Sequence, residues 1–425
     1  MEYNPHHQEY WDEESLTDDF HLAFDICNSC RLCYNLCPSF PALFEIVEGH
    51  ENDASQVTHS EMEHVADLCY QCKLCYVKCP YTPPHHYQLD FPRLMLRSKA
   101  VRAKKHGIGR SDRFLGNPEK IGQMGQIAPG LANWSVRNRG LRKLMERIYG
   151  IDHRRHLPRF APTRFSDWVR RHPARPVSAL DSTDVVIFST CTVEYHEPGI
   201  GEATLAVLRH NDIQAAVPSG QVCCGMPALD GGDMEGAIER ARTNVALLAP
   251  YARANKTILA LQPTCALLLK QDYPTLVESE DARLVASHTK DLTQYLADAM
   301  KKGKLKKDFQ SSPGQVTYHL SCHTKAQGLQ RAAKQLLEAI DGCDVEVVER
   351  CAGIDGTWGL KAKYYDEAIK VSAKLTERFQ ERHDTRACSD CALAGLQIKT
   401  VTDEEPAHPV EILARSYGLW EGNTL

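Results

Sequence analysis

The sequence lacks the usual marks of a membrane-spanning, secreted or nucleotide-binding chain. Its apolar runs are shorter than the ~20 residues that a membrane-spanning helix needs. Its first residues are acidic and polar, without the basic start and apolar centre of a secretory signal. A Gly-x-Gly-x-x-Gly run is also missing, so no flavin or NAD is expected on this chain. These absences favour a cytoplasmic protein that depends on another kind of cofactor.

Cysteine, in contrast, is abundant, with 17 in 425 residues. The reducing cytoplasm keeps thiols from pairing as disulfides, so this number needs another explanation. The spacing of the cysteines favours metal binding.

Charge divides the chain into an acidic head, a basic neck and a mildly acidic body. Residues 1–96 hold 4 Lys and Arg against 16 Asp and Glu, whereas residues 97–175 hold 20 against 5. The remainder holds 26 against 34. We expect the three regions to make different contacts.

The acidic head contains two matching cysteine runs, residues 27–38 and 69–80, with the pattern C-x2-C-x2-C-x3-C-P. This is the pattern of bacterial two-cluster ferredoxins, in which the fourth cysteine of each run ligates the other cluster. Structural zinc is the alternative, but it would leave the third and fourth cysteines of each run unexplained. The predicted ligands of one [4Fe–4S] cluster are Cys27, Cys30, Cys33 and Cys79, and those of the second are Cys69, Cys72, Cys75 and Cys37.

The body of the chain repeats itself. Residues 184–191 and 315–322 are both runs rich in strand-forming residues that end in a cysteine, 131 residues apart. Each is followed by a second cysteine motif, a helical stretch, and a cysteine before Ala-Leu. Strands that alternate with helices predict two α/β modules with parallel strands, whose sites lie at the carboxyl ends of those strands.

Each module offers four candidate metal ligands. One cluster per module and a single site shared across the module interface are both consistent with four thiolates each. Zinc, and buried thiols with a structural or redox role, are also consistent with this pattern. The roles of His319 and His323 beside Cys322 stay open between ligand, proton donor and hydrogen-bonding partner, and those of His196 and Glu197 are also open. The candidate ligands are Cys191, Cys223, Cys224 and Cys265 in the first module and Cys322, Cys351, Cys388 and Cys391 in the second.

The basic neck contains an expected amphipathic helix over residues 134–148, where apolar side chains recur at helical spacing among arginines and lysines. Such a helix packs on its own domain or docks on a membrane surface or an acidic partner. No nucleic-acid recognition motif accompanies the charge, so no nucleic-acid partner is expected.

Residues 191–199, 223–229, 263–270 and 322–328 resemble the family of the C subunit of anaerobic glycerol-3-phosphate dehydrogenase, and more distantly the iron–sulfur subunits of glycolate and lactate oxidases. The cysteine spacing also resembles the CCG domain of heterodisulfide reductase. Gln262 and Ala352 depart from that motif, since they stand where the full motif has cysteines.

The resemblance implies an electron-transfer subunit between a flavoprotein dehydrogenase and the quinone pool, at the cytoplasmic face of the inner membrane. Relatives of this architecture also occur with other redox partners, such as rubrerythrin-like proteins. The alternative is an enzyme that itself reduces a disulfide or small substrate at a cluster in the CCG modules.

The expected fold is α/β, with a helical two-cluster ferredoxin domain followed by two repeated cysteine-rich modules related by pseudo-twofold symmetry. The expected boundaries are 1–96 for the ferredoxin domain, 97–180 for the neck, 181–312 for the first module and 313–425 for the second.

Overall fold

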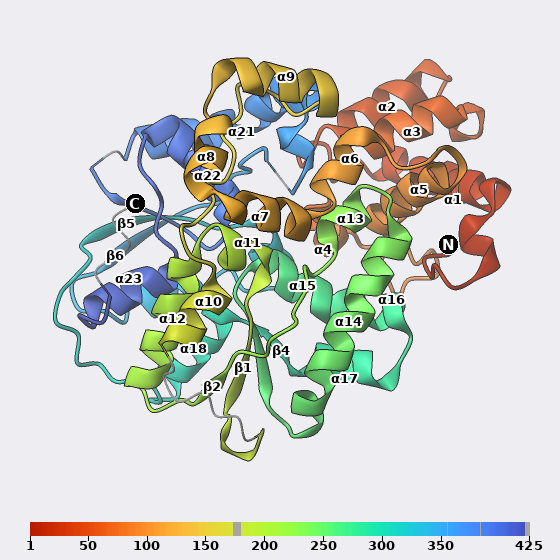
Figure 1. Ribbon diagram of the computed structural model, residues 1–425. Coiled ribbons are helices and arrows are strands. Elements are labelled where there is room, and N and C mark those ends of the chain that lie inside the picture. Colours follow the sequence, from red (N-terminus) through yellow and green to blue (C-terminus); the bar gives the residue numbers. More distant parts are fainter. Residues whose placement is uncertain (173–179, 355, 383, 421–425) are drawn as a thin grey trace.

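The computed structural model describes residues 1–172, 180–354, 356–382 and 384–420. Residues 173–179 of the predicted neck lie outside this part. Figure 1 shows the N-terminal helices packed against one side of two α/β units, with the neck helices lying across both units. Among the described residues, no helix is long and apolar enough to cross a membrane. The predicted α/β fold with two repeated modules is confirmed.

The N-terminal domain is helical, and its core is built from aromatic residues such as Phe20, Phe24, Phe40 and Phe44. A capping box between Thr58 and Glu61 begins its third helix. Its last helix extends past the predicted boundary at residue 96. The elements are η1 (Gln8–Trp11), α1 (Glu13–Cys30), α2 (Ser39–Gly49), η2 (Ala54–Gln56), α3 (His59–Leu68), α4 (Leu74–Lys78) and α5 (Phe91–His106).

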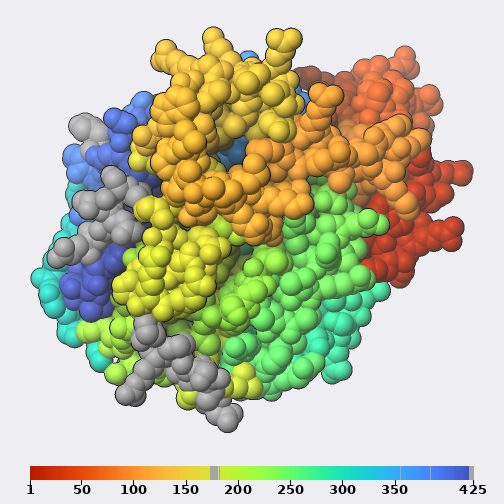
Figure 2. All heavy atoms as spheres, in the orientation of Figure 1, coloured from red at the N-terminus to blue at the C-terminus, as the bar shows by residue number. Residues whose placement is uncertain are grey.

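The neck forms short helices rather than the single amphipathic helix expected over residues 134–148. The Asn138 side chain accepts hydrogen bonds from the backbone N–H groups of Gly140 and Leu141, so a new helix begins there. Neck helices frame a hollow in Figure 2, with the second module visible at its base. The helices are α6 (Arg110–Leu115), α7 (Pro118–Ile127), α8 (Pro129–Ser135), α9 (Arg139–Tyr149) and α10 (Phe165–Arg171).

The first module contains a four-stranded parallel sheet with the order β2-β1-β3-β4. Strand β1 is apolar throughout because both faces of the sheet are covered, with Val185 and Ile187 in one core and Val186 and Phe188 in another. The strands are β1 (Val185–Phe188), β2 (Ala215–Ala216), β3 (Thr257–Ala260) and β4 (Thr289–Asp291). The helices are η3 (Leu180–Ser182), α11 (Thr190–Tyr195), α12 (Pro198–His210), α13 (Met226–Asp230), α14 (Met234–Arg253), α15 (Pro263–Gln271), α16 (Tyr273–Val277), α17 (Glu280–His288) and α18 (Leu292–Lys301).

The second module repeats this arrangement with the parallel order β6-β5-β7. A parallel bridge between Cys388 and Ala407 takes the place that β4 has in the first sheet. The strands are β5 (Gln315–His319), β6 (Asp344–Val348) and β7 (Arg386–Ser389). The helices are α19 (Cys322–Ala326), α20 (Ala332–Leu337), η4 (Trp358–Leu360), η5 (Ala362–Tyr364), α21 (Tyr365–Gln380), α22 (Ala392–Thr402) and α23 (Pro409–Ser416).

The two modules share one hydrophobic core, in which α12 packs on α23 and α18 packs on α20. The neck is fastened to the second module by backbone hydrogen bonds from Asp152 to Leu360 (2.9 Å) and from Ala362 to Gly150 (2.8 Å). These contacts fix the relative positions of the cysteine-bearing loops.

Buried ion pairs attach the N-terminal domain to the first module. Lys73 Nζ lies 2.6 Å from Asp272 Oδ2, and Lys99 Nζ lies 2.8 Å from Asp230 Oδ1. Arg93 also contacts Asp272, at 3.2 Å. Burial by itself would raise the pKa of Asp272, but the charges of Lys73 and Arg93 outweigh it and hold the pKa below its usual range.

Replacing Asp272 by Asn is expected to lower the free energy of unfolding by about 3–5 kcal/mol, because Lys73 is then buried without a counter-ion. Since the folded pKa is lowered, the stabilisation is present at neutral pH and is lost as the pH falls below about 4. Denaturant unfolding at several pH values measures both effects. Asp366→Asn is the matched control, because the Asp366 side chain is 83% exposed beside Arg154. Equal stability of the two variants would contradict the proposed importance of the buried pair.

Candidate metal centres

The first cysteine-lined cavity, called site 1, contains three cysteines of the first run and one of the second. The last turn of α1 carries two of them, and the helix ends where Arg31 adopts a left-handed conformation with φ 53°. Cys79 reaches the cavity from the end of α4. The four cysteines are Cys27, Cys30, Cys33 and Cys79.

The second cavity, called site 2, has the reciprocal composition. Its lining cysteines are Cys37, Cys69, Cys72 and Cys75. The loop between α3 and α4 bends around it through positive φ angles at Gln71 (56°) and Lys73 (58°), which are uncommon for residues with a side chain. Phe40 lines both cavities, so the two sites are neighbours.

The thiols of these sites are buried or partly buried, and for several of them the surroundings disfavour a bare thiolate. Burial raises the pKa of Cys33 to about 11 and that of Cys37 to about 12. Burial also raises the pKa of Cys27 and Cys75, and neighbouring cysteines add to this shift. A bound metal replaces the thiol protons and supplies the missing positive charge. Four converging thiols with this environment fit an iron–sulfur cluster in each cavity.

A third group of thiols, called site 3, lies at the carboxyl ends of β1 and β3 in the first module, as the repeat predicts. Cys265 Sγ lies 3.3 Å from Cys224 Sγ. Cys223 accepts hydrogen bonds from Cys191 and Cys224, which lower the pKa of its thiol. Gly225, which follows the cysteine pair, has φ 103° and turns the chain into α13.

Neck helix α7 covers site 3 with a residue that the sequence analysis missed. Glu119 Oε1 accepts a hydrogen bond from the backbone N–H of Cys223 at 2.7 Å and lies 3.3 Å from Arg240 Nε. No local pattern marks Glu119, because its partner is about one hundred residues away in the sequence.

The four candidate ligands of the second module differ in their surroundings. Cys322 and Cys351 pack beside Tyr70 and Cys72, so they face site 2, and Cys351 Sγ lies 3.8 Å from Tyr70 Oη. Cys391 begins α22 at the wall of a separate large cavity. Cys388 lies on β7 with its side chain in the core between the modules.

Comparison with known proteins places this arrangement in a family. Residues 21–107 match the citrate utilization protein B Fer4-like domain, and residues 185–270 and 316–399 match the cysteine-rich domain named CCG. Lactate utilization protein A of Bacillus cereus is 30% identical over 216 residues, which cover 49% of this chain and 87% of the relative. The chain belongs to the CCG family of iron–sulfur proteins.

Other CCG-family relatives are subunits of redox complexes. The C subunit of anaerobic glycerol-3-phosphate dehydrogenase from Escherichia coli is 27% identical over 304 residues, 71% of this chain and 76% of the relative. The B subunit of fumarate reductase (CoM/CoB) from Methanothermobacter marburgensis is 28% identical over 230 residues, 53% of this chain and 44% of the relative. The predicted resemblance to the glycerol-3-phosphate dehydrogenase protein is therefore confirmed.

In this CCG protein, His323 connects three cysteine-bearing segments. It follows Cys322, its Nε2 lies 2.9 Å from the carbonyl oxygen of Gln71 in the site 2 loop, and its Nδ1 lies 2.8 Å from Thr264 Oγ1 beside site 3. Burial lowers the pKa of His323 to about 4, so the ring is neutral at physiological pH. The sequence left His323 open between metal ligand, proton donor and hydrogen-bonding partner, and these contacts favour the hydrogen-bonding role.

His319, on β5, is likewise buried. Its ring contacts Ser389 Oγ at 3.2 Å and the carbonyl oxygen of Arg350 at 3.0 Å. Burial lowers the pKa of His319 to about 4. Both ring nitrogens are thus engaged within the second module.

Replacing Cys388 by Ala is expected to leave the iron content unchanged and to lower the free energy of unfolding by about 1–2 kcal/mol, because a buried side chain is shortened in a packed core. Cys265→Ala, which removes a site 3 thiol, is the contrasting variant and is expected to lose iron. Colorimetric iron determination with denaturant unfolding measures both. Equal iron loss in the two variants would show that Cys388 is a ligand.

Proposed function

We propose that this chain is an electron-transfer subunit that holds one [4Fe–4S] cluster at site 1 and one at site 2, and that relays electrons between a flavoprotein dehydrogenase and a quinone or another redox protein. The observation that carries the proposal is the exchange of the fourth cysteine: Cys79 lines site 1 and Cys37 lines site 2. Zinc ribbons do not require this exchange, whereas two-cluster ferredoxin runs do.

The bound clusters supply single-electron storage, and the protein determines their surroundings. Several groups donate hydrogen bonds to the ligand sulfurs, which together with burial and charge tune reduction potentials. Gln71 Nε2 lies 3.3 Å from Cys69 Sγ, and the backbone N–H of Tyr81 donates to Cys79 Sγ at 3.4 Å.

Sites 1 and 2 have different neighbours, and this difference indicates which of them a redox partner would contact. Site 2 faces the modules through Tyr70 and His323. Near site 1, in contrast, Leu32 and Tyr34 are 56% and 52% exposed. Exposed apolar side chains at a redox site favour docking of a protein partner, so we assign partner contact to site 1.

The two modules offer candidate ligands for further clusters. Site 3 offers four thiols within the first module, enough for one further iron–sulfur cluster. Thr264, which precedes Cys265 of site 3, contacts His323. The other ring nitrogen of His323 contacts Gln71 in the loop of site 2. Cys322, Cys351 and Cys391 are the remaining candidates for metal binding in the second module.

The exchange of ligands is tested in the full chain, purified without oxygen. Cys37→Ser is expected to lose the same cluster as Cys69→Ser, and Cys79→Ser the same cluster as Cys27→Ser, each at a cost of about four iron atoms. Iron and sulfide quantitation with EPR spectra of the reduced protein identifies the lost species. If Cys37→Ser instead matches Cys27→Ser, the assignment is wrong. A colourless wild-type protein with stoichiometric zinc would overturn the proposed function as a whole.

A second candidate function is docking on the cytoplasmic face of the inner membrane through the neck. The apolar face of α7–α9 is defined by Met124, Ile127, Leu131, Trp134, Leu141, Leu144 and Ile148, all of which are exposed. Ile127 is 84% exposed. Arg137, Arg139, Lys143 and Arg147 lie among these residues, and an apolar face with basic neighbours favours an anionic lipid surface.

The double variant Trp134→Glu, Leu144→Glu is expected to reduce binding to vesicles of phosphatidylglycerol and phosphatidylcholine by more than about tenfold. In this variant, two apolar side chains that would enter the lipid surface are replaced by carboxylates, which the anionic headgroups repel. Cosedimentation at low salt measures the bound fraction. Ile369→Glu is the control, since Ile369 is an exposed apolar residue on α21, outside the face. Unchanged vesicle binding by the double variant removes this candidate function.

A further inference from the structure

A large cavity of about 1240 Å³ lies apart from sites 1, 2 and 3. Three parts of the chain enclose it: neck residues 136–163, residues 196–202 of the first module and residues 389–411 of the second. Cys391 stands on its wall. The cavity therefore joins elements that are distant in the sequence.

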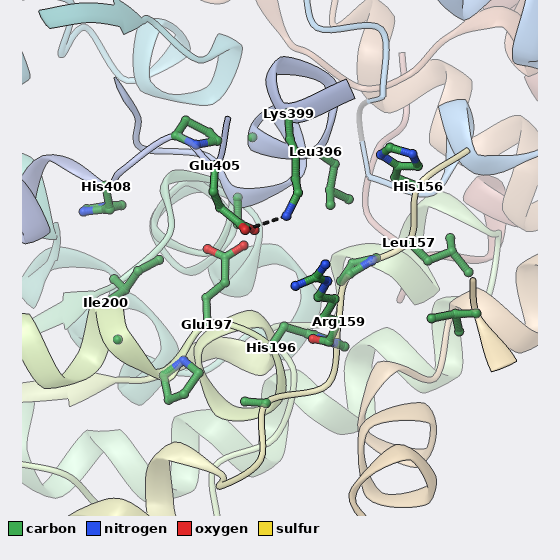
Figure 3. Close-up of a pocket in the computed structure, with 18 of the residues that line it drawn as sticks. His156, Leu157, Arg159, His196, Glu197, Ile200, Leu396, Lys399, Glu405 and His408 are labelled. Carbon is green, nitrogen blue, oxygen red and sulfur yellow. Dashed lines mark hydrogen bonds and ion pairs between the residues drawn. The ribbon is translucent and has the colours of Figure 1, made fainter. Parts of the chain in front are cut away.

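Four polar side chains meet inside the cavity, which we call the polar cluster: Arg159, Glu197, Lys399 and Glu405 (Figure 3). Lys399 Nζ contacts Glu405 Oε2 at 2.5 Å. The Glu197 carboxyl group points toward that of Glu405, and the Arg159 guanidinium group points toward both. Within the described part of the chain, the side chains of Glu197 and Arg159 make no hydrogen bond or ion pair.

The lining carries an excess of positive charge. It contains nine Arg or Lys residues and five Asp or Glu residues. Three of the cations, Arg137, Arg139 and Lys143, are exposed on the neck wall and have no ion-pair partner among the described residues. An excess of unpaired cations around a cavity attracts anions from solution.

The acids inside the cavity do not cancel this excess. Burial raises the pKa of Glu197 to about 8, with further raising by Glu411 and Glu405 and lowering by Lys399. Burial raises the pKa of Glu411 to about 7. At neutral pH the Glu197 carboxyl group is therefore mostly uncharged and able to donate a hydrogen bond.

The other titratable groups around Glu197 are mostly neutral or cationic. Burial lowers the pKa of His196, on the same segment, and lowers that of His408, next to α23, to about 3. The neck contributes Arg159 and His156, which lines the same cavity. The lining also carries the carboxyl groups of Glu202, Asp403 and Glu405, and Glu405 is paired with Lys399.

We propose that the cavity binds a small organic oxyanion, a carboxylate or a phosphate ester, with Arg159 as its ion-pair partner and the Glu197 carboxyl group as a hydrogen-bond donor. Arginine suits this role because its planar fork of N–H donors matches the two oxygens of a carboxylate or phosphate group. The cationic neck wall guides the anion inward. A ligand held here lies beside the Cys391 wall of the second module.

Isothermal titration calorimetry of the full chain, purified without oxygen, tests the proposal with lactate, fumarate, inorganic phosphate and sn-glycerol 3-phosphate as probes, and glycerol as the uncharged control. At least one anion is expected to bind, and Arg159→Gln to weaken that binding about tenfold, which corresponds to the loss of one charged hydrogen bond. The carboxylate and phosphate arms identify the preferred oxyanion.

Arg209→Gln, an exposed arginine outside the cavity, is the matched control. Absence of heat with every anion, or wild-type affinity in Arg159→Gln, overturns the proposal.

The same titration between pH 7 and pH 9 tests the role of Glu197. Affinity of the wild type is expected to fall as the pH rises through about 8, since ionised Glu197 repels the ligand. Glu197→Gln keeps a neutral donor and is expected to lose the part of this fall that is centred near pH 8, while the ionisation of Glu411 near pH 7 still acts on the cavity. An identical pH dependence in this variant contradicts the role of Glu197.

Anion binding is expected to persist in Cys37→Ser, so failure of this proposal is distinguishable from failure of the electron-transfer proposal.

Discussion

Two lysines of the N-terminal domain, Lys73 and Lys99, are buried beside carboxylates of the first module, Asp272 and Asp230. Such charges are tolerated in a protein interior only when their partners are in place, so docking of the two domains is held to one geometry. Lys73 lies within the site 2 loop, and Lys99 also donates a hydrogen bond to the carbonyl oxygen of Cys69. The same contacts that join the domains therefore hold the loop that carries the site 2 cysteines.

The modules use their parallel sheets to present cysteine-bearing loops at the carboxyl ends of the strands. In the first module the loops after β1, β2 and β3 bring four thiols together, with Glu119 of the neck closing over them. In the second module the loops after β5 and β6 turn Cys322 and Cys351 toward the N-terminal domain instead. The loops of both copies thus carry cysteines, and those of the second copy also pack on the N-terminal domain.

Features that depend on local pattern were predictable from the sequence. The strand-forming runs before Cys191 and Cys322 predicted β1 and β5, and both are confirmed as central strands of parallel sheets. The ligand assignment of the cysteine runs stays a prediction, although the two cavities group the cysteines in the predicted sets. The neck helix was predicted over too long a range, because the capping by Asn138 was not recognised as a break.

Features that depend on contacts between distant segments could not be predicted in this way. Cys388 stands at the position of a ligand in the repeat, but strand alternation turns it into the core and turns Ser389 toward His319. Glu119, Arg159 and Glu405 belong to segments without any motif, whereas Glu197 was singled out but its neighbours in the cavity were not. Their roles depend on how the neck lies across the modules, and short-range spacing contains no information about that.

The reciprocal lining of sites 1 and 2 has a consequence for the biogenesis of the protein. During synthesis from the N-terminus, the first three cysteines emerge well before Cys79, because the segments of α2, α3 and α4 lie between them in the sequence. A nascent chain that ends before Cys79 lacks the fourth cysteine that lines site 1. Both cysteine sets of the proposed clusters are therefore complete only when the second run has been synthesised, and a chain truncated between the two runs would retain neither set.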